Sequence, residues 1–387
     1  MKEKYCKIPK FRFNKFLESW KRLKYEDVIE VNSGKDYKHL EKGDIPVYGP
    51  GGYMLSVSEA ITNKDGVGIG RKGTINKPYI LKAPYWTVDT LFFCIPKNKY
   101  NLYFINAIFE RTQWERFDES TGVPSLSKLT INNIQNYFPS FDEQSAIGSL
   151  FRTLDDLLAS YKDNLANYQS LKATMLSKMF PKAGQTVPEI RLDGFEGEWK
   201  LYELKSRAET ITKGTTPKDK SWQGEVNYIK TESINRDTGS LVRTASTSLD
   251  EHLGYLKRSI LKEDDVLFSI VGTLGVVGIV DKKDLPANTN QQIAIIRLKR
   301  DDAIFMLNFL KSPRIKSFIK SDSTIGAQPS LSLWQIEKIK VSLPPSLEEQ
   351  QAIGTYFSNL DNLINSHQEK ISQLETLKKK LLQDMFI

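Results

Sequence analysis

The sequence predicts an α+β fold in which two mixed, β-rich domains are separated by two long helices. The helices are expected to pair as an antiparallel coiled coil, within a pseudo-twofold internal repeat. Three observations predict this fold. Residues 141–180 align without a gap onto residues 347–386, with 15 of 40 positions identical. Both segments carry the apolar spacing of a coiled-coil seam. The residues before each segment repeat more faintly, which indicates that one unit of domain and helix was duplicated.

The expected division places a first domain at residues 1–140 and a second at 183–346, with a central helix at 141–182 and a C-terminal helix at 347–387. A chain of 387 residues is long enough for such domains to bury cores of their own. No apolar run approaches the roughly 18 residues of a membrane span, and none near the N-terminus suggests a signal sequence. The two cysteines, Cys6 and Cys94, predict neither a disulfide framework nor a metal-ligand pair, so a cytoplasmic protein is expected.

Each domain opens and closes on repeated residues, whereas the interiors diverge. The interiors read as strands at residues 87–95 and 293–298 and as short helices at 103–116 and 303–320. The repeated positions are Pro9, Phe11, Arg12, Phe13, Trp20 and Gly34, with Pro124 to Ser127, in the first domain; they match Pro188, Ile190, Arg191, Leu192, Trp199 and Gly214, with Pro329 to Ser332, in the second.

A glycine cluster occurs in each domain, at Gly66 to Thr74 and at Gly272 to Gly278. The first contains a formal G-x-G-x-x-G, but a dinucleotide site needs that motif to open a helix. The β-branched and proline-containing residues that follow predict a glycine-rich hairpin instead. Such a hairpin either lets Arg71 and Lys72 approach a DNA groove closely or is a surface turn without contacts.

Each long helix begins at a predicted capping box, Ser140 to Glu143 and Ser346 to Glu349. Apolar residues then alternate at spacings of four and three, and the register breaks at the same place in both, where Leu171 and Leu377 are expected to continue the seam. The two seams are predicted to pack on each other, although unrelated partners or homodimerisation are alternatives. The predicted helix-pair interface comprises Ile147, Phe151, Leu154, Leu158 and Leu165 with Ile353, Phe357, Leu360, Ile364 and Ile371.

The net charge of +8 is concentrated in the two predicted domains. Residues 1–140 carry +7 and residues 183–346 carry +3, whereas the helical segments carry 0 and −2. Nucleic acid is the expected anionic partner, because phosphate contacts dominate its affinity for proteins. The alternative is a basic surface that binds no partner.

No catalytic constellation is visible in the sequence. The histidines His39, His252 and His367 are scattered, so no metal site is predicted. The sequence contains no P-loop pattern, and no cofactor is expected.

With its order of domain, helix, domain and helix, the chain resembles the specificity subunit of a type I restriction-modification enzyme along essentially its whole length. The motifs that carry the resemblance are Glu-Gln-x-x-Ile-Gly at Glu143 and at Glu349, and the openings at Trp20 and Trp199. The segments Asp44 to Gly49 and Arg71 to Ile75 are also similar to segments of such domains.

The resemblance implies two target-recognition domains that each read one half of a bipartite, gapped DNA target, with spacer helices that set the gap. It implies no chemistry in this chain, and as partners double-stranded DNA, two methyltransferase (modification) subunits and restriction/translocase subunits, without a membrane. The candidate DNA-binding residues are Lys35, Tyr37, Arg71, Lys72 and Thr74 in the first domain and Lys213, Thr215, Lys218, Lys230, Arg236 and Thr273 in the second.

Two other classes of protein stay open from the sequence. A coiled-coil adaptor with two protein-binding domains would show no salt-sensitive DNA binding. A stand-alone enzyme would show hydrolytic or methyl-transfer activity as the purified chain.

Overall fold

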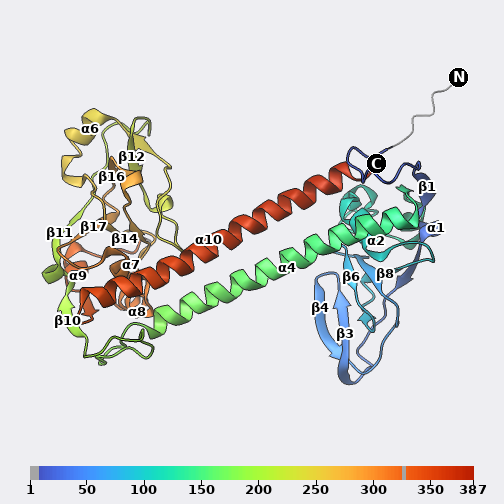
Figure 1. Ribbon diagram of the computed structural model, residues 1–387, viewed down its shortest axis with the longest axis horizontal. Helices are drawn as coiled ribbons and strands as arrows, with labels where there is room; N and C mark the ends of the chain where they lie inside the picture. The colour runs from blue at the N-terminus through green and yellow to red at the C-terminus, as the bar shows by residue number, and fades with distance from the viewer. Residues whose placement is uncertain (1–7, 325–327) are drawn as a thin grey trace. The chain divides into compact units, whose positions relative to one another are not determined.

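The structure is a computed structural model that describes residues 8–324 and 328–387. Cys6 lies outside these residues, and Cys94 is a buried free thiol. The chain divides into two compact units: unit 1 comprises Met1–Lys162 with Glu369–Ile387, and unit 2 comprises Asp163–Gln368. Each of the two long helices, α4 (Phe141–Lys178) and α10 (Leu347–Asp384), therefore contributes residues to both units (Figure 1).

Unit 1 contains three small sheets, with strand orders β2-β8-β5-β6, β4-β3-β7 and β1-β9. The helix α2 packs on the first sheet, and its N-cap Asn101 accepts hydrogen bonds from two backbone amides of the first turn. The strands are β1 (Lys21–Lys24), β2 (Ile29–Ser33), β3 (Lys42–Gly49), β4 (Gly52–Val57), β5 (Gly66–Gly70), β6 (Tyr79–Leu81), β7 (Trp86–Thr87), β8 (Leu91–Pro96) and β9 (Gln135–Phe138); the short helices are α1 (Tyr25–Val28), α2 (Leu102–Arg111), η1 (Trp114–Phe117) and α3 (Lys128–Asn133).

Unit 2 repeats this plan, with strand orders β11-β17-β14-β15, β13-β12-β16 and β10-β18. The strands are β10 (Lys200–Glu203), β11 (Ala208–Lys213), β12 (Val226–Ile229), β13 (Ser246–Thr247), β14 (Val266–Ser269), β15 (Val277–Ile279), β16 (Ala287–Thr289), β17 (Ile293–Leu298) and β18 (Lys340–Leu343). The helices are α5 (Leu204–Arg207), η2 (Thr231–Ser233), α6 (Leu249–Leu253), η3 (Lys257–Ser259), η4 (Lys282–Asp284), α7 (Ala303–Lys311), α8 (Pro313–Asp322) and α9 (Leu333–Glu337). The expected mixture of strands and helices in two domains is confirmed.

The predicted short elements are confirmed with three adjustments. The predicted helix at 103–116 ends at Arg111 as α2, and the separate 3-10 helix η1 follows at Trp114–Phe117. The strand at residues 293–298 has the predicted bounds, whereas the segment 87–95 is divided by a turn between β7 and β8. The predicted helix at 303–320 is two helices, because Pro313 begins α8 and has no amide to continue the hydrogen bonds of α7.

Within each unit, one half of α4 lies against one half of α10 in antiparallel sense. In unit 1, Lys162 pairs with Glu375 and Asp155 pairs with Lys378, so the partner's number falls as the residue number rises. In unit 2, the ring of Tyr168 lies 5.1 Å from that of His367, and Lys172 pairs with Asp361. Of the predicted interface residues, Leu165 and Ile371 are half-buried and the others are buried: Ile147, Phe151, Leu154, Leu158, Ile353, Phe357, Leu360 and Ile364.

The predicted seam is wrong where its register breaks. Leu171 and Leu377 are exposed, and the next residues, Lys172 and Lys378, turn inward in their place. A buried lysine is stable only with partners for its charge. The partner from the opposite helix is Asp361 for Lys172 and Asp155 for Lys378. The same ion pair therefore occurs once in each unit.

The residues that follow each long helix complete the core of one unit, unit 1 for α10 and unit 2 for α4. Phe386, after α10, lies 6.2 Å from the Trp20 ring and 5.8 Å from the Phe151 ring in unit 1. Phe180, after α4, lies 6.3 Å from Trp199 and 6.1 Å from Phe357 in unit 2. The repeated Met-Phe ending is thereby explained as a core contribution.

Candidate nucleic-acid interface

The repeated opening residues anchor each unit to the first turn of a long helix. The Glu143 carboxylate, which is 1% exposed, accepts two 2.7 Å hydrogen bonds from Arg12 and one of 3.3 Å from the Trp20 indole. In unit 2, the Glu349 carboxylate accepts the equivalent hydrogen bonds, from Arg191 at 2.8 and 2.7 Å and from the Trp199 indole at 3.3 Å.

The predicted capping boxes are therefore only half correct. The hydroxyls of Ser140 and Ser346 accept hydrogen bonds from the backbone amides of Glu143 and Glu349, at 3.5 and 3.2 Å. The two glutamate carboxylates bind the arginines. Bidentate arginine–carboxylate pairs are strong and directional. They fix how the chain of each unit enters its long helix.

The remaining residues of the Glu-Gln-x-x-Ile-Gly motif position α2 and α7. The Gln144 side chain accepts a hydrogen bond from the amide of Asn101, the N-cap of α2, at 3.1 Å. A Cβ on Gly148 would lie 2.3 Å from the Asn101 side chain, so this close approach requires glycine. Gln350 and Gly354 repeat both contacts at Asp302, the N-cap of α7. The motif is therefore a structural joint between helices.

In unit 1, two loops that carry candidate residues bond to the turn at residues 88–90 or to Thr87 and Leu91, the strand residues on either side of it. The amide of Lys35 donates to Thr87 O at 2.9 Å, and that of Gly34 donates to Leu91 O at 3.1 Å. From the other side, the Arg71 amide donates to Thr90 O at 2.8 Å. Lys35, Arg71, Lys72 and Thr74 are exposed, whereas Tyr37 is half-buried against the cluster that contains Val47 and Trp86.

The Arg71 loop is held in a tight conformation by its neighbours. A Cβ on Gly70 would lie 1.9 Å from the carbonyl oxygen of Thr74, and Gly73 has a φ of +91°. The guanidinium of Arg71 lies 5.8 Å from the centroid of the Phe92 ring and donates to Asp89 O at 3.3 Å. Its charge is thus positioned at an exposed surface by stacking and a backbone contact.

The predicted glycine-rich hairpin at Gly66 to Thr74 needs correction in the place of its turn. Gly66 to Gly70 form the buried strand β5, and the turn lies beyond them, between β5 and β6. The backbone bond from Gly73 N to Pro124 O, 2.8 Å, recurs as that from Gly272 N to Pro329 O, 2.9 Å. The two glycine clusters therefore correspond only at Gly73 and Gly272.

Unit 2 builds the same frame from different side chains. The amide of Thr215 donates to Thr289 O and that of Ile270 donates to Gln292 O, at 2.9 and 2.7 Å, which repeats the bonds of Lys35 and Arg71. Ile270 and Val271 thus occupy the places of Arg71 and Lys72.

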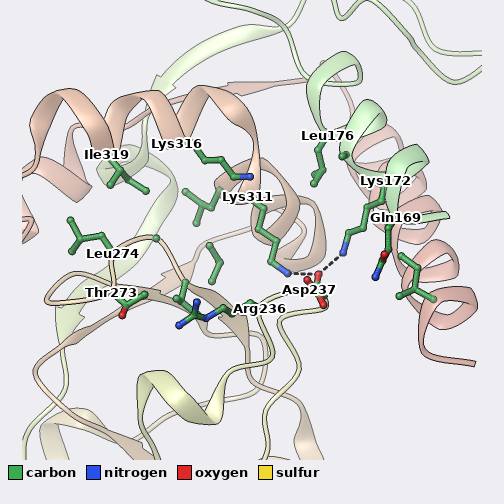
Figure 2. A pocket seen from close by; sticks show the side chains of 16 residues that line it. Gln169, Lys172, Leu176, Arg236, Asp237, Thr273, Leu274, Lys311, Lys316 and Ile319 are labelled. Atoms are coloured by element: carbon green, nitrogen blue, oxygen red, sulfur yellow. Dashed lines mark hydrogen bonds between the residues drawn. The ribbon is translucent and has the colours of Figure 1, made fainter. Parts of the chain in front are cut away.

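The candidates of unit 2 fall into two groups. Lys213 and Thr215 adjoin the turn at residues 289–292, while the ammonium groups of Lys218 and Lys230 lie 4.8 Å and 3.6 Å from the rings of Tyr255 and Trp222. The second group, Arg236 and Thr273, instead lines a pocket beside the helices (Figure 2).

Sequence reasoning missed three residues of the first group. Arg258 donates a hydrogen bond to the Thr215 hydroxyl at 3.4 Å. The rings of Tyr255 and Trp222 make the cation–π contacts with Lys218 and Lys230. The basic pair Lys257-Arg258 beside an exposed tyrosine was the available signal.

Aromatic packing supports the hairpin β3–β4 of unit 1, whose tip exposes Tyr53 and Met54. The Tyr79 hydroxyl donates to Gly49 O at 2.6 Å, and the Tyr48 ring lies 6.1 Å from that of Tyr79. Burial raises the pKa of Tyr79, so its hydroxyl keeps the donated proton at all ordinary pH values.

Among residues 8–324 and 328–387, no group of three or more His, Cys, Asp or Glu side chains is placed to hold a metal ion. No helix in the described part of the chain is both long and apolar enough to cross a membrane.

Comparison with known proteins identifies a family. The family model described as "Type I restriction modification DNA specificity domain" matches residues 18–167 and 196–376. The MjaVIII specificity subunit of Methanocaldococcus jannaschii is 24% identical over 275 residues, covering 68% of this chain and 64% of that protein. The EcoBI specificity subunit of Escherichia coli is 23% identical, covering 95% and 86% respectively. The aligned chain thus spans slightly less than two thirds of the first of these relatives.

Solved structures share the fold at low sequence identity. The crystal structure of an S subunit from M. genitalium matches with a TM-score of 0.69 and 16% identity, over 98% of this chain and 99% of that chain. A structure from work on assembly of the type I R-M system matches with a TM-score of 0.52 and 15% identity, over 96% and 98%. Because the family model covers most of the chain in two blocks, the chain belongs to the family of type I restriction-modification DNA specificity subunits.

Proposed function

We propose that this chain reads a bipartite, gapped DNA target in the cytoplasm, each domain binding one half. The two helices form an antiparallel coiled coil with pseudo-twofold symmetry that sets the length of the gap. They also bind two methyltransferase subunits, and restriction/translocase subunits join this complex. The chain contributes recognition and no catalysis. The domains are residues 1–140 and 183–346, and the spacer helices are 141–182 and 347–387.

The observation that carries this proposal is one backbone frame with two sets of side chains. Arg71 and Ile270 make the same backbone bonds to neighbouring segments, yet the Arg71 side chain is exposed whereas that of Ile270 is buried in the core of unit 2. A reader of two unlike half-sites needs this combination, because base edges are distinguished by the side chains that reach them. The repeated joints at Glu143 and Glu349 would present equivalent surfaces to two copies of one partner.

The test is co-expression with the neighbouring methyltransferase subunit, followed by mapping of methylated adenines across the host DNA. One bipartite, gapped motif that disappears without this chain is the expected result. Methylation that is ungapped or independent of the chain would contradict it. A protein-binding adaptor is the rival, and duplex binding that weakens steeply with salt would exclude it.

Arg71→Ala is expected to relax base preference within one half-site and leave the other unchanged. Loss of a direct arginine contact to a base costs about 1–3 kcal/mol of discrimination. The measurement is the methylation map of the variant. Lys10→Ala, which removes an exposed charge outside both loops, is the matched control. An unaltered preference would remove Arg71 from the reading residues.

Four residues inserted into each spacer helix are expected to lengthen the unread gap. One added turn extends a helix by about 6 Å, close to the rise of two base pairs. Insertions after Lys162 and after Gln368 fall at the division between the units. The methylation map should then contain both original half-sites at a wider spacing. A map with an unchanged gap would rule out the helices as the ruler.

A further inference from the structure

A pocket of about 610 Å³ in unit 2 carries three lysines besides Arg236, and these lysines are not among the DNA-binding candidates. It lies between α4, α7, α8 and the loops that carry Arg236 and Thr273 (Figure 2). Its cationic residues are Lys172, Lys311, Lys316 and Arg236, and its apolar wall includes Leu274, Val276, Leu310 and Ile319.

Two of the lysines converge on one backbone oxygen. Lys311 donates to Asp237 O at 3.0 Å, and Lys172 donates to the same oxygen from the opposite side (Figure 2). Lys172 also has the carboxylate of Asp361. Within the described residues, Lys311 has no carboxylate partner of its own, and the side chains of Lys316 and Arg236 have neither a hydrogen bond nor an ion pair.

Unit 1 supplies a comparison from the same chain. Counted from the N-caps Asn101 and Asp302, Lys311 occupies the place of Glu110. In unit 1, Lys378 pairs with Glu110 at 2.6 Å and with Asp155, so one lysine meets two carboxylates. In unit 2 the equivalents of Lys378, Glu110 and Asp155 are Lys172, Lys311 and Asp361, which are two lysines and one aspartate. The exchange reverses the sign of a partly buried charge cluster that otherwise repeats.

The charge of Lys311 is costly without an anion. Burial and, to a smaller extent, the neighbouring Lys172 lower the pKa of Lys311 to about 7, although Asp361 and Asp237 act to raise it. A half-buried cation is stabilised by an anion that enters the pocket, since the apolar walls strengthen the attraction.

We propose that this pocket binds a phosphate group through Lys311, Lys316 and Arg236. Lysine and arginine donors on three sides match the several acceptor oxygens of a tetrahedral phosphate. The volume lies in the range of small-molecule sites and exceeds what one phosphate fills, so an organic moiety can lie against Leu274 and Ile319. The phosphate comes either from such a small molecule or from a DNA backbone.

Calorimetric titration of the full chain with inorganic phosphate near pH 6 tests the site. Saturable binding with a Kd of about 1 mM or tighter is expected. Lys311→Glu copies the residue of unit 1 and provides a partner for Lys172, so the variant should fold while binding phosphate about tenfold more weakly or worse. Lys320→Glu makes the same charge change at an exposed position of α8 outside the pocket, and should stay within about twofold.

Absence of phosphate binding to the unaltered chain would overturn the proposal, as would equal weakening by Lys311→Glu and Lys320→Glu. If Lys311→Glu does not fold, Lys316→Glu decides, because its side chain is exposed at the pocket. Phosphate binding that survives Lys316→Glu undiminished would then count against the site.

The pH dependence provides a second readout, with sulfate as an oxyanion whose charge does not change near neutrality. Lys311 is charged below its pKa, so sulfate affinity should be greatest below pH 7 and fall above it. The charged groups facing Lys311 are Lys172, Asp361, Asp237, Lys316 and Arg236. Lys311→Arg stays protonated and should abolish the decline; an identical decline would refute the role of Lys311.

Duplex binding distinguishes the two sources of phosphate. If the DNA backbone supplies the phosphate, Lys311→Glu lowers duplex affinity more than Lys320→Glu does. If a small molecule supplies it, the two variants bind duplex equally. Either result, obtained with a chain that binds inorganic phosphate, supports the site and identifies its occupant.

Discussion

Arg12→Met is expected to destabilise unit 1 by about 3–5 kcal/mol, because it leaves the Glu143 carboxylate buried without its cation. The 3.3 Å hydrogen bond from the Trp20 indole to Glu143 brings no positive charge to replace that cation. Arg191→Met should do the same to unit 2 through Glu349. The two variants thus make one prediction at two sites.

Hydrogen exchange measures this effect unit by unit, which suits a chain whose two units need not unfold together. Amides of β1 and β9 should lose protection in Arg12→Met, and amides of β10 and β18 in Arg191→Met. Lys205→Met, which breaks an exposed pair with Glu337, should change protection by less than about 1 kcal/mol.

A double-mutant cycle separates the pair from its parts. Glu143→Gln removes the buried charge, so Arg12→Met in that background should cost less than in the unaltered chain. Costs that simply add would show that Arg12 and Glu143 do not stabilise each other, and the joint would need another explanation.

The long helices were the most predictable part of the fold, since their periodicity and start signals are local. The expected span 141–180 became Phe141–Lys178, and 347–386 became Leu347–Asp384. The inward turn of Lys172 and Lys378 was not predictable in this way. A lysine reads as polar, and only the position of Asp361 or Asp155 on the other helix makes its burial favourable.

The candidate interface was predicted in composition but not in arrangement. Lys35 and Arg71 lie in segments separated by strands, and they come together because Lys35 bonds to Thr87 at the end of β7 and Arg71 bonds to Thr90 in the turn that follows. Sheet pairing between distant strands is not encoded in local pattern. The role of Glu143 was also missed, because the spacing of Ser140 and Glu143 is the same whether the carboxylate caps the helix or binds a buried arginine.

Gly34→Ala is the second variant for which a large effect is expected. An alanine Cβ would lie 2.0 Å from Val88 O and 2.5 Å from Thr87 O, both backbone atoms that cannot rotate away. The strand end must therefore separate from the turn, breaking the bonds from Gly34 N to Leu91 O and from Lys35 N to Thr87 O. Each buried bond lost costs about 1–3 kcal/mol, and the clash adds to that cost.

The functional consequence follows from the same geometry. Because the turn at residues 88–90 also holds the Arg71 amide, its displacement should disturb both candidate loops at once. We expect Gly34→Ala to lower exchange protection in β2 and β8 and to abolish methylation at the gapped target. Gly51→Ala adds the same methyl group where no atom lies within 4 Å, and should leave both unchanged. Full methylation by Gly34→Ala would show that the reading surface does not depend on this turn, and Arg71 would then have to be positioned by Phe92 and the Pro124 segment alone.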